Sequence, residues 1–386
     1  MSHEIQLILC CASTKISSER TKRIYQLLAE KENINWQFVL ATADEHGVIP
    51  LVYWQLKEIS TQLPTPVWQQ LTAAFNQNAY HNLSLTAELC KISKIFTENK
   101  LIFLAFKGAV LAKLAYGDIA LRQFVDLDIL VLESAVAAAS NILINHGYQP
   151  QFQFTQEQQK QYIKIRSEHN FWHPEKDITV DLHWSVLPKN FSFSPPQELV
   201  WSEPQEVNFG SVKIKTLSSE TLLLFLSTHA GKHNWNHLCW ICDLAELINS
   251  HPNLDWHWLE ENCQRIGTKK MFWLSLYLAH DLLETPLPQE ILERLKADSK
   301  TSYLSQEVKE ILFANKSYAI GSFPVENIYL QTMDSWRDKV WYWLDAIITP
   351  TPLEWQIISL PKWLFFIYYP IRLVRIVFRF VLRHEE

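Results

Sequence analysis

Residues 101–131 read LIFLAFKGAVLAKLAYGDIALRQFVDLDILV, and this stretch decides the fold. It opens with an apolar run over 101–106 that has the length of a buried strand. Lys107-Gly108 then predicts a turn, and residues 109–116 predict a helix. A second apolar run, 127–132, is typical of another strand. The sequence therefore predicts that short strands alternate with helices around this stretch.

Two aspartates lie in the second of these strands at alternate positions. Asp126 and Asp128 are two residues apart, so the period of a strand puts both on one face and the apolar Leu127 on the other. Carboxylates on one face repel each other, and a pair of Mg²⁺ ions about 3.5–4 Å apart would neutralise them and serve phosphoryl transfer. Asp181 alternates with apolar neighbours in a later run, 178–184, and could join the same site. By itself the pattern also fits strand-end acids that face solvent.

The residues before the acidic strand add a candidate phosphate site. Gly108 lies at the expected helix start, where a missing side chain lets a phosphate approach backbone N–H groups and the positive end of the helix dipole. Lys107 could neutralise more of the phosphate charge, and Arg122, four residues before Asp126, is a second candidate contact. Either cation alone could be an ordinary solvated charge. Together these elements predict a site for a nucleoside triphosphate and a metal.

Helical regions are expected on both sides of this stretch. From Leu85 to Phe96 apolar residues recur at i, i+4, i+7 and i+11, which is one face of an amphipathic helix. Residues 169–184 predict a hairpin, residues 204–216 a second strand pair, and the sequence after Ser218 a helical region that extends to about 345. We therefore expect four parts: a helical region at 1–100, a mixed core at 101–217, a helical domain at 218–350 and a basic aromatic tail at 351–386.

Composition excludes several classes of protein. A chain of 386 residues with 48% hydrophobic and 20% charged residues is globular rather than disordered or collagen-like. Lys and Arg number 35 against 41 acidic residues, and the net charge of −6 disfavours a long nucleic acid as partner. The nearest two glycines, Gly108 and Gly117, are too far apart for a dinucleotide-binding or P-loop motif. Six cysteines in so long a chain predict reduced thiols and a cytoplasmic protein.

The tail allows two interpretations. Residues 363–382 are strongly apolar, but arginines recur at 372, 375, 379 and 383, and burying them in a bilayer would cost several kcal/mol, so we reject a spanning helix. In one interpretation residues 361–386 lie on an anionic membrane surface or a partner, which would make the protein membrane-peripheral. In the other they form a helix that packs on the protein and solvates its arginines.

A histidine-rich segment follows Thr228. His229, His233 and His237 are four residues apart, and Cys239 and Cys242 come close behind, as zinc ligands could. Apolar residues fill the gaps between them, and a continuous helix would point the thiols away from the histidines. Histidines satisfied in a core are the alternative.

The order of these motifs resembles the nucleotidyltransferase superfamily typified by DNA polymerase beta, in which a hydrophobic-Gly turn precedes Asp-hydrophobic-Asp and a third acid on a later strand. Phe106-Lys107-Gly108 with Asp126-Leu127-Asp128 looks like its Lys-Gly branch, which includes abortive-infection-type nucleotidyltransferases. The whole chain is similar to an uncharacterised bacterial nucleotidyltransferase family of about this length. Further residues that carry this similarity are His46-Gly47-Val48-Ile49-Pro50, Asp181-Leu182-His183-Trp184 and the segment from His229 to Asp243.

The resemblance implies an α+β fold, with a polymerase beta-like mixed sheet and flanking helices between N- and C-terminal helical regions. It implies an enzyme that uses Mg²⁺ or Mn²⁺ to move a nucleoside monophosphate from an NTP to an unidentified small-molecule or protein acceptor, releasing pyrophosphate. Asp126 and Asp128 would be metal ligands and Asp181 the third acid. The alternative is a non-catalytic nucleotide-binding or antitoxin-like regulatory module.

The resemblance also suggests which residues meet the substrate. Lys107, Gly108 and Arg122 would hold phosphate charge, and Lys232 or His233 would reach back from the helical domain to the triphosphate or the acceptor. Ala109 stands where many superfamily members have serine, so a hydroxyl contact to phosphate is lost.

Overall fold

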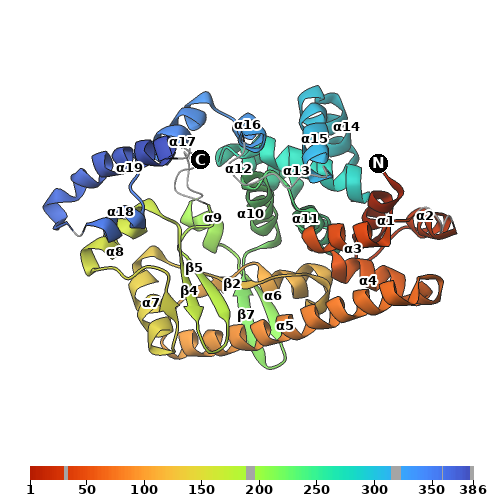
Figure 1. The fold of residues 1–386 in the computed structure, drawn as a ribbon, viewed down its shortest axis with the longest axis horizontal. Helices are drawn as coiled ribbons and strands as arrows, with labels where there is room; N and C mark the ends of the chain where they lie inside the picture. Colours follow the sequence, from red (N-terminus) through yellow and green to blue (C-terminus); the bar gives the residue numbers. More distant parts are fainter. Residues whose placement is uncertain (30–33, 188–195, 314–322, 359, 383–386) are drawn as a thin grey trace.

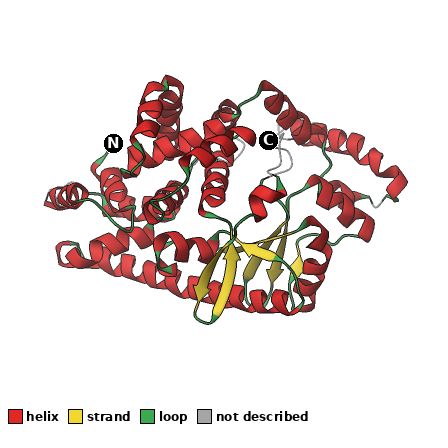
Figure 2. Ribbon diagram, turned by 180° about the vertical axis from the view of Figure 1, so that it is seen from behind, coloured by secondary structure: helices red, strands yellow, loops and turns green. Residues whose placement is uncertain are grey.

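A computed structural model describes residues 1–29, 34–187, 196–313, 323–358 and 360–382 (Figure 1). Within them, a five-stranded mixed sheet lies among helices that precede it, cover it and follow it (Figure 2). The predicted α+β class, a mixed sheet with flanking helices, is confirmed. The division into four parts stays a prediction.

The sheet places the two acidic strands side by side. Its order is β1-β2-β5-β4-β3, with β2 and β5 parallel and the other neighbours antiparallel. β4 and β5 are the hairpin that the sequence predicted over 169–184. The strands are β1 (Phe103–Ala105), β2 (Asp126–Val131), β3 (Gln149–Pro150), β4 (Glu168–His173) and β5 (Ile178–His183).

One long helix, α5 (Thr65–Glu98), runs along one face of this sheet (Figure 1). Its predicted apolar stripe from Leu85 to Phe96 is buried in one cluster with Leu127 and Ile129 of β2. Because side chains alternate along a strand, the packing of Leu127 and Ile129 on α5 turns the aspartates of β2 to the opposite face.

The helix predicted over 109–116 is interrupted. One α-helical turn, α6 (Gly108–Leu111), passes into a π-helical turn over Ala112–Tyr116 and ends at Gly117, whose φ is +78°. A 3₁₀ turn, Ile119–Leu121, leads into β2. Around the sheet lie α7 (Val136–Asn145), α8 (Gln156–Ile165), α9 (Gln197–Trp201) and the predicted strand pair, β6 (Gln205–Phe209) and β7 (Val212–Thr216).

The helices before and after the sheet share one apolar core. Leu7 and Ile8 of the first helix belong to the same buried cluster as Leu276 and Leu278 of the later helical region. The helices before the sheet, besides α5, are α1 (His3–Cys11), α2 (Ser18–Ala29), α3 (Trp36–Glu45) and α4 (Ile49–Leu56). Those after it are α10 (Ser219–Lys232), α11 (Leu238–Ser250), α12 (Trp256–Arg265), α13 (Lys269–Leu283), α14 (Gln289–Ala297), α15 (Ser299–Leu312) and α16 (Phe323–Thr332).

A buried carboxylate joins these two helical regions. Glu246 of α11 is 1% exposed and accepts a hydrogen bond from the Thr14 backbone N–H at 2.8 Å. The hydroxyls of Ser13 and Thr14 donate to the same carboxylate, each at 2.5 Å. The segment after α1 is thereby attached to a helix that lies more than 230 residues later in the chain.

The arginines of the tail pair within the tail itself, and Trp355 and Tyr368 pack it on the apolar cluster of the sheet. Tyr368 is buried, and Arg372 and Arg375 pair with the fully buried carboxylate of Glu354. Arg383 lies outside the described residues, as does the side chain of Arg379. In the described part of the chain, no helix combines the length and apolar character that crossing a bilayer requires. The helices of the tail are α18 (Pro352–Ile357) and α19 (Tyr368–Leu382), and α17 (Trp336–Ile348) precedes it.

Candidate active site

The strand register brings two of the predicted acids face to face. In the parallel pair of β2 and β5, Asp128 is directly opposite Asp181. Asp126 lies two residues earlier on the same face of β2, and Asn170 of β4 is opposite Asp181 on its other side. The sequence predicted this shared face for the aspartates from their alternation alone.

Asp128 is the most enclosed of the three acids. Its residue is 3% exposed, and its Oδ1 lies 2.7 Å from Lys107 Nζ and 3.0 Å from His183 Nε2. Burial by itself would raise the pKa of Asp128, but the charge of Lys107 and the hydrogen bonds from His183 and Lys107 outweigh burial and hold this pKa well below its usual range. Asp128 is therefore ionised at neutral pH. Its second oxygen, Oδ2, is buried and has no hydrogen-bond partner.

The other two acids have raised pKa values. Burial, followed by repulsion from Asp128, raises the pKa of Asp126 to about 6. Burial and Asp128 also raise the pKa of Asp181, although the Asn170 amide donates a hydrogen bond to its Oδ1. Three carboxylates crowded in this way disfavour their own ionisation, so a nearby positive charge would be stabilised.

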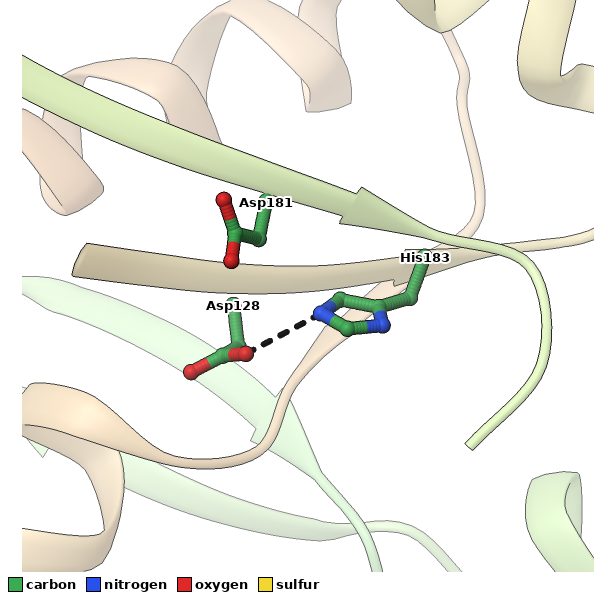
Figure 3. Close-up of side chains that lie close together, drawn as sticks. All are labelled: Asp128, Asp181 and His183. Atoms are coloured by element: carbon green, nitrogen blue, oxygen red, sulfur yellow. Dashed lines mark hydrogen bonds and ion pairs between the residues drawn. The ribbon is translucent and has the colours of Figure 1, made fainter. Parts of the chain in front are cut away.

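A possible metal-binding group is formed by Asp128, Asp181 and His183. Each offers one ligand atom, and these three atoms lie within 4.8 Å of one another (Figure 3). In the part of the chain that the structure describes, no other group of histidine, cysteine and acidic side chains converges in this way. The two carboxylates, the imidazole and the partnerless Asp128 Oδ2 fit a divalent cation. Asp126 lies beside this group rather than within it.

His183 was not singled out from the sequence. The signal was available, because His183 follows Asp181 by two residues and so shares its strand face.

A cavity of about 250 Å³ opens beside these acids. From the sheet side Lys107, Asp126, Asp181 and His183 line it, and from α10 and the loop after it Thr228, His229, Lys232 and His233 do so. The structure thus brings the predicted Lys232 and His233 to the same cavity as the acids. Burial, then the neighbouring Lys232, lowers the pKa of His233 to about 4, so this imidazole is neutral at pH 7.

Arg122 has a different partner from the one that the sequence suggested. Its Nε and Nη2 lie 2.7 and 2.8 Å from the two carboxylate oxygens of Asp243 on α11, and Tyr116 donates to the same carboxylate at 2.7 Å. Arg122 does not line the cavity. To contact a phosphate Arg122 would have to leave this buried, bidentate pair, so its role as a phosphate contact stays a prediction.

Gly108 is required by packing against the acidic strand. Its φ is +49°, and a Cβ there would lie 3.2 Å from the Asp126 carbonyl oxygen and 3.6 Å from the Phe124 ring. The missing side chain therefore makes room for β2. The sequence had suggested a different reason for this glycine, the close approach of a phosphate.

Replacing Gly108 with Ala is expected to destabilise the protein by about 1–2 kcal/mol through its φ alone, with a further loss from the tight contact to Asp126. Gly117→Ala is the matched control, because Gly117 also has a positive φ but nothing lies within 4 Å of its Cβ position. Urea unfolding of both variants gives the two losses. Equal losses would show that the contact with β2 contributes nothing.

The histidine-rich segment does not form a metal site among the described residues. The His229 and His233 rings contact each other with centroids 4.9 Å apart, while Cys242 donates to the Ala12 carbonyl at 3.4 Å. Cys239 packs against Gly47. All six cysteines are free thiols.

Comparisons with known proteins give one match to a family model, described as "Uncharacterised nucleotidyltransferase", over residues 32–284. Among solved structures, the lincosamide antibiotic adenylyltransferase LnuA in its lincomycin-bound form is 19% identical, with a TM-score of 0.31 over 42% of this chain and 94% of that one. A nucleotidyltransferase-like antigen from Paracoccidioides brasiliensis is 14% identical, with a TM-score of 0.35 over 58% and 97% of the two chains. The antibiotic-resistance factor ANT(2'')-Ia is 14% identical, with a TM-score of 0.27 over 57% and 93%. No curated protein matches the chain.

Proposed function

The chain belongs to the uncharacterised nucleotidyltransferase family, as its motifs predicted, and from this premise we propose that it moves a nucleoside monophosphate from an NTP to an acceptor molecule and releases pyrophosphate. The observation that carries the proposal is the register of β2 and β5, which sets Asp128 opposite Asp181 beside a cavity that holds lysines from both of its walls. Carboxylates with facing cations are what a metal-bound triphosphate needs.

In this proposal Asp126, Asp128 and Asp181 hold Mg²⁺ or Mn²⁺, which would neutralise phosphate charge and lower the pKa of the attacking group. The acceptor's nucleophilic atom forms a bond to the α-phosphorus, and the bond from that phosphorus to pyrophosphate breaks, so pyrophosphate leaves with the electron pair. Asp181, whose pKa burial and Asp128 raise, would take the acceptor's proton.

The cationic and neutral side chains of the cavity would position the triphosphate. Lys107 lines the cavity while it pairs with Asp128, and Lys232 faces it from the end of α10. Burial, then the nearby Lys107, lowers the pKa of His229 well below its usual value, and the pKa of His233 is lowered as well. Neutral imidazoles can offer hydrogen bonds to phosphate or acceptor without adding charge.

The test is incubation of the purified chain with α-labelled NTPs, Mg²⁺ or Mn²⁺ and a cell extract, followed by detection of pyrophosphate and of a labelled product. We expect both products from the wild type and neither after chelation of the metal. NTP binding without pyrophosphate release under any of these conditions would support the rival function, a non-catalytic nucleotide-binding or antitoxin-like module.

We also propose that the tail contacts an anionic membrane surface. The outward side of α19 is apolar: Leu373, Val374, Val377 and Phe378 are exposed, while Arg372 and Arg375 turn inward to Glu354. Helix α17 likewise exposes indoles, at Trp336, Trp341 and Trp343. A helix that faces only water would show the reverse arrangement.

Charge favours a lipid surface as the occupant of this face. Residues 336–386 contain seven Lys and Arg residues against five acidic ones, a balance of +2 in a chain whose net charge is −6. Basic residues beside exposed indoles are typical of segments that lie in the headgroup region of anionic bilayers.

The full chain is therefore expected to co-sediment with vesicles that contain anionic lipid, and to do so less as salt rises through about 0.1 M. Leu373→Ser with Phe378→Ser should weaken the binding, whereas Tyr80→Ser, which removes a more exposed aromatic ring from α5, should not. A dimer in solution that the double variant dissociates, with no vesicle binding, would instead identify this face as an interface between two copies of the chain.

A further inference from the structure

Each ring nitrogen of His183 has an acidic neighbour. Nε2 lies 3.0 Å from Asp128 Oδ1, and Nδ1 lies 3.3 Å from Oε2 of Glu168, the residue directly opposite it on β4. The imidazole is almost fully buried, and its ring packs edge-on against Phe106 with centroids 5.0 Å apart. The ring thus directs Nε2 to Asp128 and Nδ1 toward Glu168.

This arrangement is the one that metal-binding histidines adopt. A histidine that ligates a metal through one nitrogen nearly always gives its other N–H to a carboxylate or carbonyl, which fixes the tautomer and the ring. Glu168 supplies such a carboxylate at Nδ1. On the other side, the atoms that converge with Nε2 come from Asp128 and Asp181.

Asp128 adds an independent observation. Its side chain is 1% exposed, and its Oδ2 is buried without a partner although Oδ1 has two. A buried carboxylate oxygen without a partner is costly, and a cation bound beside Asp181 would satisfy it.

We propose that His183 is a metal ligand of this site, with Glu168 as its positioning residue, and that the site prefers a first-row transition ion to Mg²⁺. The inference shares one element with the proposed function, on which it rests: both place the metal at Asp128 and Asp181. Mg²⁺ strongly prefers oxygen ligands, whereas imidazole suits transition ions. A site built from two carboxylates and one imidazole therefore discriminates against Mg²⁺ through its nitrogen.

The test uses the full chain loaded with Mn²⁺ alone, without nucleotide. Electron spin-echo spectra of the wild type should show modulation from a directly bound ¹⁴N, and His183→Gln should lose it. His233→Gln is the matched control: it makes the same substitution in the same cavity, outside the converging group, and should keep the modulation. Absence of ¹⁴N modulation in the wild type, or its survival in His183→Gln, would overturn the proposal.

Metal affinity tests the role of Glu168 and covers the case in which His183→Gln does not fold. Glu168→Gln should keep the nitrogen signal and weaken Mn²⁺ binding about 10- to 100-fold, while Mg²⁺ binding changes little. Unchanged Mn²⁺ affinity would overturn the positioning role. Because the spin-echo samples contain no nucleotide, their result does not depend on catalysis. If the protein transfers nucleotide but shows no ¹⁴N modulation, only the role of His183 as a ligand is wrong. If it shows the modulation but transfers no nucleotide, only the proposed function is wrong.

Discussion

Asp128→Asn should reduce nucleotidyl transfer more than a thousandfold. The amide keeps the shape of the side chain but loses the charge that faces Lys107, His183 and the converging atom of Asp181. Metal ions contribute several kcal/mol of charge stabilisation in the transition state, and each 1.36 kcal/mol is a factor of ten in rate. Initial rates of pyrophosphate release at saturating NTP give the ratio directly.

The same variant should also unfold at a lower urea concentration, because it leaves the ammonium of Lys107 without its partner in a largely buried position. Asp181→Asn separates the two effects. Asp181 is only partly buried and receives a hydrogen bond from Asn170, so its loss should abolish transfer with a smaller loss of stability. Transfer by Asp128→Asn above a tenth of the wild-type rate would contradict the proposed role of Asp128.

Asp243→Ala is expected to lower the free energy of unfolding by about 3–5 kcal/mol. The substitution leaves the buried Arg122 guanidinium without its bidentate partner and removes the acceptor of the Tyr116 hydroxyl. The pair joins the segment before β2 to α11, so its loss also loosens the approach to the acidic strand. Urea unfolding measures the change.

The double variant Arg122→Met with Asp243→Leu is the matched control. It removes both charges together, so neither is left buried and alone, and it should be more stable than Asp243→Ala. If Arg122→Ala instead kept full stability and raised the KM for NTP, this result would support the sequence-based prediction that Arg122 contacts a phosphate.

Short-range periodicity explains which parts of the site could be predicted. The two-residue alternation of a strand placed Asp126, Asp128 and Asp181 on sheet faces, and the break before Ile178 indicated the hairpin that carries Asp181. The apolar face of α5 was equally visible, because its period of 3.6 residues repeats over several turns.

The remaining contacts depend on tertiary structure. Arg122 looked like a free cation because its partner, Asp243, is 121 residues away in the chain. The neighbours of Gly108 are likewise set by how β2 passes the turn, which no local pattern encodes. The pairing of Arg372 and Arg375 with Glu354 depends on how α19 folds back on α18.

The attachment of Thr14 to Glu246 has a consequence for biosynthesis. Glu246, which accepts the hydrogen bond from Thr14, is made 232 residues later, so at roughly 5–20 residues per second the ribosome needs about 10–50 s to supply it. During that interval α1 can pack on α2, α3 and α4 but not on α13. The apolar surface that α13 covers in the folded protein is thus open to aggregation and to chaperones while the chain is being made.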